Sequence, residues 1–186
     1  MSETRLWLVR HAPVAAPLGV IYGPDAPADI SSAAAISALQ AILPRGGKTI
    51  ASPARRTLET AAALGLTARV DEAFREQHFG AWTGRRHDDL ENELGEDYRS
   101  FWRSAALNRP PGGESFCDQI ARVRDGLNRL PDGDVVLIVH SGTVRASLAI
   151  ALDISPDSAL RLVIDPWSLT RIDRLASRWR VVCVNR

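Results

Sequence analysis

The stretch RLWLVRHAPV, residues 5 to 14, predicts the first strand of the fold and two basic side chains at its end. Its four consecutive apolar residues, Leu6 to Val9, are typical of a strand that is buried on both faces of a parallel sheet. Arg10 and His11 follow at once, and Pro13 ends the run soon afterwards. Two polar groups at the tip of a core strand need a partner, which must come from elsewhere in the chain.

Length and composition indicate one domain, residues 1–186. The chain has 186 residues, of which 45% are hydrophobic, enough for one core. Its formal net charge of +1 argues against binding to nucleic acid or to a membrane surface. The two cysteines, Cys117 and Cys183, lack metal-type spacing and favour reduced thiols. There is no signal-peptide pattern and no apolar run of membrane-spanning length, so we expect a cytoplasmic protein.

Apolar runs typical of strands alternate with segments of helical pattern. Strands are expected at 5–9, 48–52, 68–74 and 134–139, with two more joined by a tight turn within 168–185. Helices are expected at 31–43, 53–64, 86–108 with a break near Gly95, 116–130 and 143–152. The pattern favours a three-layer α/β sandwich with a mostly parallel central sheet, an antiparallel C-terminal element and a small helical lid.

The ends of the expected strands carry side chains that suit a phosphate group. Carboxyl ends of parallel strands meet at one edge of a sheet, where ligands bind. Arginine offers a planar fork of donors, a helix N-terminus adds N–H groups, and histidine can attack phosphorus covalently. The residues at or just after the strand ends are Arg10, His11, Ser52, Arg55, Arg56, Glu76, His140, Ser141 and Gly142.

Five motifs, in this order, resemble those of the histidine phosphatase (phosphoglycerate mutase-like) superfamily. They are LVRHA at 8–12, SPARRTLETA at 52–61, REQHFGAWTG at 75–84, PPGGES at 110–115 and VLIVHSGTVR at 136–145. In this register Arg56, four residues after Ser52, matches the phosphate-binding arginine of the family, whereas Arg55 does not. The resemblance implies that residues 79–112 form the lid insertion.

The resemblance implies a mechanism that needs neither metal nor cofactor. His11 would attack a small phosphate monoester and become phosphohistidine, while cationic side chains supply the charge that a metal otherwise would. Glu76 would protonate the leaving oxygen and then activate the water that hydrolyses the phosphohistidine. The implied catalytic residues are His11, Glu76 and His140, and the implied substrate phosphate-binding residues are Arg10, Arg56 and Ser141.

The chain departs from the family motif beside the nucleophile. The family usually reads Arg-His-Gly-x-Thr-x-x-Asn, but Val14 and Pro17 stand at the threonine and asparagine positions. Ser141 replaces the glycine usual after the second histidine and offers a replacement donor. Each lost hydrogen bond to a charged group is worth roughly 1.5–3 kcal/mol. The departures therefore bear on activity and pocket shape more than on the chemistry.

The resemblance is strongest to the α-ribazole phosphatase group of cobalamin biosynthesis, so α-ribazole 5′-phosphate is the leading expected substrate. Two other functions stay open. One is a phosphoglycerate mutase-like phosphotransferase that uses the same His11. The other is a weakly catalytic module that binds a phosphorylated ligand. The aromatic side chains between Trp82 and Arg109 fit either a lid over the substrate or a packed core. The oligomeric state is left open.

Overall fold

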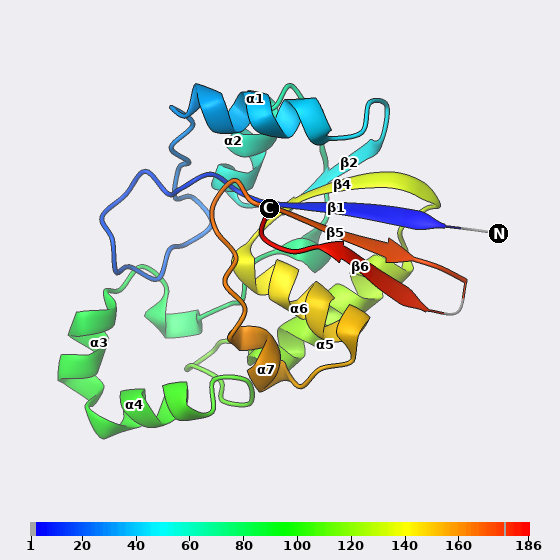
Figure 1. The fold of residues 1–186 in the computed structure, drawn as a ribbon. Coiled ribbons are helices and arrows are strands. Elements are labelled where there is room, and N and C mark those ends of the chain that lie inside the picture. The colour runs from blue at the N-terminus through cyan, green and yellow to red at the C-terminus, as the bar shows by residue number, and fades with distance from the viewer. Residues whose placement is uncertain (1–2, 177) are drawn as a thin grey trace.

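The computed structural model describes residues 3–176 and 178–186, and a six-stranded mixed sheet forms its centre (Figure 1). The strands are β1 (Thr4–Arg10), β2 (Lys48–Ala51), β3 (Arg69–Val70), β4 (Gly133–Val139), β5 (Leu169–Arg174) and β6 (Trp179–Cys183). Their order is β3-β2-β4-β1-β5-β6. The first four are parallel, whereas β5 pairs antiparallel with β1 and with β6. This confirms the mostly parallel sheet with an antiparallel C-terminal element.

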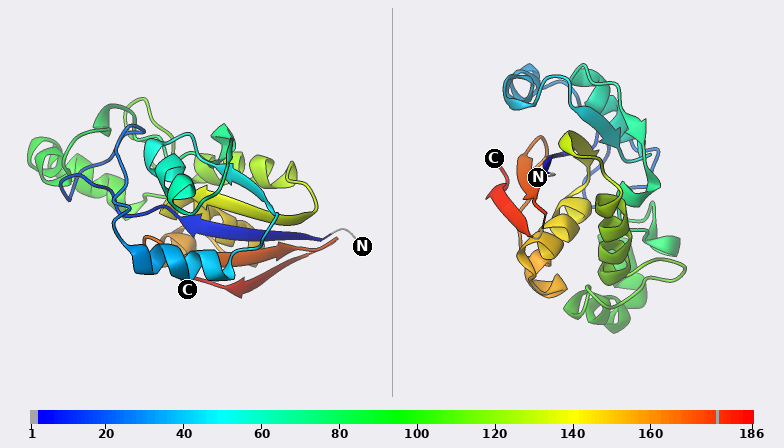
Figure 2. Two further views of the ribbon diagram at one scale, coloured as in Figure 1. Left: turned by 90° about the horizontal axis from the view of Figure 1, so that it is seen from above. Right: turned by 90° about the vertical axis from the view of Figure 1, so that its right-hand side faces the viewer.

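Helices cover both faces of the sheet and complete the α/β sandwich (Figures 1 and 2). On one face lie α1 (Ala33–Ile42) and α2 (Arg55–Ala63). On the other face lie α5 (Phe116–Asn128), α6 (Ser141–Leu152) and the short α7 (Pro156–Leu160). Among the described residues, no helix combines the length and apolar character that crossing a bilayer requires.

The two faces of the sheet support two separate cores, which explains the unbroken apolar runs in β1 and β4. Successive side chains of a strand point to opposite faces. Leu8 and Leu137 belong to the larger core, together with apolar residues of α5 and α6. Val9 and Ile138 belong to the second core, together with residues of α1 and α2. Both central strands are therefore held rigidly up to their carboxyl ends.

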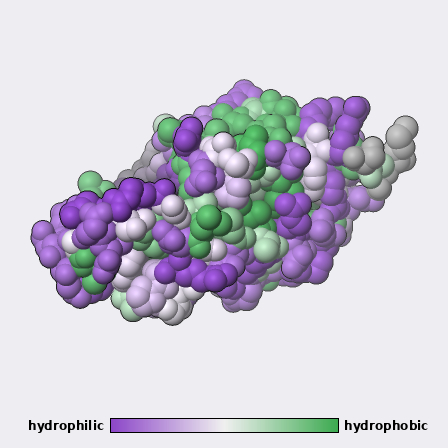
Figure 3. Space-filling model, turned by 90° about the horizontal axis from the view of Figure 1, so that it is seen from below, coloured by the Kyte–Doolittle hydropathy of each residue, from purple (hydrophilic) through white to green (hydrophobic). Residues whose placement is uncertain are grey.

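Residues 79–103, between the 3-10 turn η1 (Glu72–Phe74) and α5, are called the helical segment below. They include two short helices that lie beyond the carboxyl ends of β1 and β4 (Figures 1 and 2). These are α3 (His87–Leu94) and α4 (Glu96–Arg103), preceded by the 3-10 turn η2 (Gly80–Trp82). Gly95 separates them with a φ of 55°, in agreement with the expected break. They have a small core of their own, made of Ile21, Trp82, Leu90, Tyr98 and Phe101. Their outer surface is mainly hydrophilic (Figure 3).

Three element predictions need correction. Pro53 precedes α2 instead of lying in its first turn, because Ala54 is the N-cap residue. The strand expected at 68–74 is only the two-residue β3, because the side chain of Asp71 accepts a hydrogen bond from the Ala73 backbone and starts the 3-10 turn η1 (Glu72–Phe74). The helical region expected up to residue 108 ends at Arg103.

Two C-terminal features complete the comparison with the sequence. The short helix α7 was not expected, although Ser155 caps it and Pro156 occupies its first turn, both ordinary start signals. The predicted tight turn between β5 and β6 includes residue 177, which lies outside the described residues.

Candidate active site

The neighbouring strands β1 and β4 bring the two histidines together. Their parallel register pairs Arg10 with Val139, so His11 and His140 follow directly at the same edge of the sheet. The backbone N–H of His11 donates to the carbonyl of Val139 at 2.9 Å. The two imidazole rings lie edge to face with centroids 5.1 Å apart. Both side chains are buried, with 4% of His11 and none of His140 exposed.

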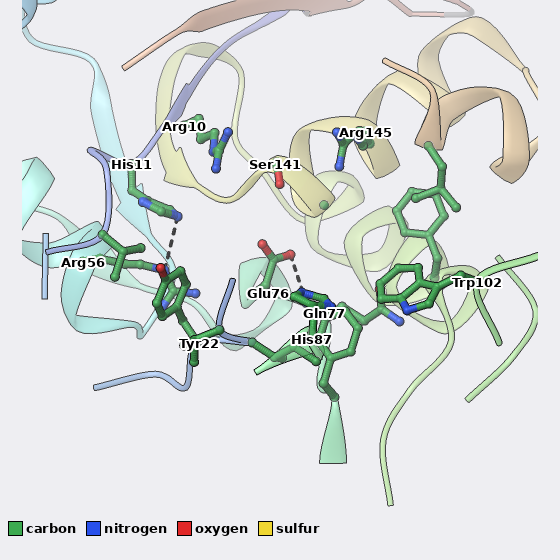
Figure 4. A pocket seen from close by; sticks show the side chains of 17 residues that line it. Arg10, His11, Tyr22, Arg56, Glu76, Gln77, His87, Trp102, Ser141 and Arg145 are labelled. Carbon is green, nitrogen blue, oxygen red and sulfur yellow. Dashed lines mark hydrogen bonds between the residues drawn. The ribbon is translucent and has the colours of Figure 1, made fainter. Parts of the chain in front are cut away.

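Arg56, at the start of α2, bridges the two histidines. Its Nε donates to Nε2 of His11 at 3.2 Å, as Figure 4 shows. Its Nη2 lies 3.2 Å from Nδ1 of His140, and its Nη1 donates to the carbonyl of Gly23 at 2.8 Å. Arg55, by contrast, is exposed and pairs with Glu59 on the surface of the helix. The structure therefore places Arg56, and not Arg55, beside the histidines.

The surroundings of His11 leave its Nε2 as the reactive nitrogen. Its Nδ1 lies 2.5 Å from the carbonyl of Ala12, which can only accept, so Nδ1 carries the proton. Nε2 then presents a lone pair toward Arg56. Burial holds the pKa of His11 well below its ordinary 6.5, and the neighbouring charges of His140, Arg56 and Arg10 lower it further. A neutral, oriented imidazole of this kind is a competent nucleophile.

His140 is held from two sides. Its Nε2 lies 2.7 Å from the hydroxyl of Ser52 at the end of β2, while its Nδ1 faces Arg56. Burial, followed by the charge of Arg56, also holds the pKa of His140 well below 6.5. Ser52 thus fixes the orientation of the His140 ring. The sequence predicts Ser52 at the end of a strand but does not reveal that His140 is its partner.

Glu76 approaches the histidines from the loop after η1. Its Oε2 lies 3.9 Å from Nδ1 of His140, and its side chain is 28% exposed. Its Oε1 accepts hydrogen bonds from the backbone N–H of Gln77 at 3.1 Å and from Nε2 of Gln119 at 3.3 Å. Glu76 lines the same cavity as His11, which is the position that a proton donor to a leaving oxygen needs.

Gln119 is a site residue that the sequence reading missed. It lies on α5, is fully buried and contacts Glu76. It shares the buried face of α5 with Phe116, Ile120 and Val123, where the spacing predicts apolar residues. One amide in such an apolar stripe is the signal that would have found it, since a buried polar side chain requires a partner.

A cavity of about 370 Å³ joins these groups (Figure 4). Five of the six predicted site residues line it, whereas His140 lies buried behind Arg56. Because α6 begins at Ser141, and because Ser141 and Gly142 both line the cavity, the N-terminal end of α6 borders it. Unpaired N–H groups at a helix start favour an anion. The five predicted site residues among those that line it are Arg10, His11, Arg56, Glu76 and Ser141.

The helical segment contributes the opposite wall of the cavity. Phe79, His87 and Trp102 line it, and 42% of Trp102 is exposed. Tyr98 and Phe101 are instead buried in the small core of the segment. The aromatic residues of this region are therefore divided between the wall of the cavity and a packed core.

The two departures from the family motif have visible consequences. Val14 lines the cavity, so an apolar side chain stands where the family places a hydroxyl. The carbonyl of Pro17 accepts a hydrogen bond from the hydroxyl of Tyr22 at 2.7 Å, and Tyr22 also lines the cavity. Among the described residues, no cluster of three or more His, Cys, Asp or Glu side chains could hold a metal ion.

A family model described as the histidine phosphatase superfamily (branch 1) matches residues 6–186. The chain belongs to the histidine phosphatase superfamily. Among curated members of this superfamily, a glucosyl-3-phosphoglycerate phosphatase of Mycobacterium tuberculosis is 36% identical over 119 residues, or 55% of this chain and 52% of that protein. A 2,3-bisphosphoglycerate-dependent phosphoglycerate mutase of Methylobacterium sp. is 36% identical over 93 residues, or 47% of this chain and 45% of that protein. The chain spans only 37–52% of the length of the first curated relatives it matches.

Solved structures of two phosphatases match nearly the whole chain. A mycobacterial glucosyl-3-phosphoglycerate phosphatase superposes with a TM-score of 0.84 at 29% identity, covering 98% of this chain and 99% of that one. An α-ribazole phosphatase of Shigella flexneri superposes with a TM-score of 0.84 at 23% identity, covering 98% and 96% of the two chains. At that lower identity the likeness concerns the fold alone. The superfamily relatives thus include both phosphatases and mutases.

Proposed function

We propose that this member of the histidine phosphatase superfamily hydrolyses a small phosphate monoester through a phosphohistidine on His11. One observation carries the proposal. The neutral imidazole of His11 directs Nε2 toward Arg56, beside a cavity that Glu76 lines from another element of the fold. Nucleophile, cation and proton donor thus share one space, which is the requirement of a double-displacement phosphatase.

In the first step, Nε2 of His11 forms a bond to phosphorus as the bond from phosphorus to the leaving oxygen breaks. Glu76 gives its proton to that oxygen, so the leaving group departs as an alcohol. In the second step, the carboxylate of Glu76 takes a proton from a water molecule that attacks the phosphohistidine. Phosphate is released, and His11 and Glu76 return to their starting states.

The charge on the transferred group is matched by the walls of the cavity. Arg10 and Arg56 each carry a guanidinium there, and the start of α6 adds backbone N–H groups at Ser141. A planar guanidinium group can donate two parallel hydrogen bonds to a pair of phosphate oxygens, and the stabilisation is largest where negative charge spreads over these oxygens in the transition state. His140, held by Ser52, supports this set from behind Arg56.

Two named substrates are candidates. The sequence resemblance favours α-ribazole 5′-phosphate. The relative at 36% identity favours glucosyl-3-phosphoglycerate. The mutase relative makes phosphotransfer between two positions of a phosphoglycerate the competing reaction, since it uses the same first step.

The deciding experiment incubates the purified protein with both esters and with 3-phosphoglycerate, and measures phosphate release and isomerisation in parallel. Mass spectrometry after an acid-free quench detects phosphate on His11. We expect phosphate release and a phosphorylated His11 peptide, both lost in His11→Ala. Isomerisation in excess of phosphate release would establish the mutase instead. If the protein binds an ester but neither hydrolyses nor isomerises it, and if His11→Ala changes nothing, the protein is the binding module instead.

A further inference from the structure

Arg145 is a third arginine of the cavity and has no part in the mechanism above. It lies on α6 one turn after Ser141, so both side chains project from the same face of the helix. Both residues line the 370 Å³ cavity. The cavity therefore holds three guanidinium groups, on Arg10, Arg56 and Arg145, and one carboxylate, on Glu76.

The guanidinium of Arg145 is anchored at one end and available at the other. Its Nε donates to the carbonyl of Leu162 at 2.8 Å. Its two terminal nitrogens donate to no other described residue. Partial burial lowers the pKa of Arg145, and the charge of Glu76 opposes this effect. A half-buried cation with two unused donor groups favours an anionic partner.

Arg145 lies apart from the groups that face the nucleophile. In Figure 4 it is on the far side of Ser141 from His11, toward Trp102. The charges of Arg10 and Arg56 lower the pKa of both histidines, whereas the charge of Arg145 acts on Arg10 instead. The phosphoryl group must lie against His11, so Arg145 faces the other half of the substrate.

The charges indicate the kind of group that Arg145 meets. Arg10 and Arg56 match the two negative charges of a phosphate monoester. Arg145 is then the single remaining positive charge, on the side of the leaving group. One positive charge matches a carboxylate better than it matches a second phosphate dianion. Three aromatic side chains, Phe79, His87 and Trp102, also line the cavity, together with Gln77 and Leu160.

We propose that the natural substrate carries a carboxylate on its leaving group and that Arg145 binds it. Arg145 is thus a specificity-determining residue of the site, and this role rests on the proposed function. It places esters of the phosphoglycerate type ahead of α-ribazole 5′-phosphate, whose leaving group has no carboxylate.

The test uses two esters that differ at one carbon. 3-Phosphoglycerate and glycerol 3-phosphate carry the same phosphate, but the first ends in a carboxylate and the second in a hydroxymethyl group. We expect the wild-type kcat/KM to favour 3-phosphoglycerate by about 10- to 100-fold, mainly through KM. Equal kcat/KM for the two esters would overturn the inference without any variant, so it stays testable even if substitutions at Arg145 impair folding.

The variants then assign the preference to one side chain. Arg145→Gln should remove the preference for 3-phosphoglycerate. It should raise the KM for this ester about 10- to 100-fold and leave the KM for glycerol 3-phosphate unchanged. Arg145→Lys should keep part of it, since the charge remains. Arg161→Gln, an exposed arginine after α7, is the matched control and should behave as wild type. An equal loss for both esters in Arg145→Gln would indicate that Arg145 only anchors Leu162.

The two esters, 3-phosphoglycerate and glycerol 3-phosphate, also distinguish failure of the inference from failure of the proposed function. If neither ester nor either of the two named candidate substrates is hydrolysed, and no phosphohistidine forms, the proposed function is wrong. Calorimetric binding of the two esters to the unaltered protein then still decides the role of Arg145. Tighter binding of 3-phosphoglycerate that is lost in Arg145→Gln supports the inference, and equal binding overturns it.

Discussion

The side-chain amide of Gln119 lies 3.3 Å from Oε1 of Glu76, and Gln119 is fully buried. Its own Oε1 has no hydrogen-bond partner among the described residues. A glutamine amide can turn over, so Nε2 donates to an ionised carboxylate and Oε1 accepts from a protonated one. Gln119 is therefore able to hold Glu76 in both protonation states that the proposed mechanism requires.

Replacing Gln119 by leucine should lower kcat about 10- to 100-fold on an alkyl phosphate and leave KM nearly unchanged. The loss on p-nitrophenyl phosphate should be much smaller, because its phenolate leaves without needing a proton. Steady-state kinetics on the two esters measure the difference. Gln40→Leu, at an exposed position of α1, is the control. An equal loss on both esters would show that Gln119 does not act through Glu76.

Gly142 should tolerate no larger residue without a cost in activity. A Cβ at this position would clash with Oε1 of Glu76 and with Oε1 of Gln119, so the ends of both side chains would have to shift. Glu76 lines the cavity and has room to move away, and alanine improves helix propensity by up to about 1 kcal/mol. We therefore expect Gly142→Ala to keep its melting temperature while kcat on alkyl phosphates falls. Unchanged kcat would mean that the position of Glu76 is not critical.

The adjacent arginines of α2 offer a matched pair. Arg56→Lys keeps the charge but cannot reach both histidines and Gly23 at once, so kcat/KM should fall about 100- to 1000-fold. Arg55→Lys changes only an exposed ion pair with Glu59 and should leave kcat/KM within about twofold of wild type. Similar losses in the two variants would contradict the assignment of Arg56 to the site.

Stability should fall below pH 6.5 because the fold holds His11 and His140 neutral. Their pKa values lie well below 6.5 when folded, whereas the unfolded chain takes up protons near 6.5. The stabilisation is thus complete above pH 6.5 and is lost as the pH falls below it. Each histidine contributes a slope of at most about 1.4 kcal/mol per pH unit.

Urea unfolding at pH 7.5, 6.5 and 5.5 measures this slope in the wild type and in His140→Gln. The variant should lose less stability per pH unit than the wild type. His78→Gln, at an exposed position, should keep the wild-type slope. The same slope in all three proteins would show that His140 is not held neutral by the fold.

Much of the fold follows from local signals in the sequence. Leu6, Leu8 and Val9 are buried in β1, Gly95 separates two helices, and Ser115 caps α5 through a capping box with Asp118. Local signals give the wrong element length where a side chain competes for the hydrogen bonds of the regular backbone. At Asp71 the side chain takes a backbone N–H and ends β3 after two residues, which hydrophobic periodicity does not reveal.

The candidate site divides in the same way. The residues that end strands or begin helices were found because topology gathers such positions at one edge, as with His11 and His140. Gln119 and Arg145 lie inside helices, where a single polar residue is ordinarily a solvated or structural one. Only the packing of α5 and α6 against the strand ends shows that both side chains face the site.

The helical segment rests on a small core separate from the two cores that hold β1 and β4. The groups proposed to carry out the chemistry are thus fixed by one part of the molecule, and the aromatic wall opposite them by another. Substitutions in α3 and α4 should alter which alcohol is accepted without displacing His11 or Arg56. The aromatic wall can therefore be redesigned for other alcohols on a support of its own, while Arg145 on α6 stays with the reacting groups.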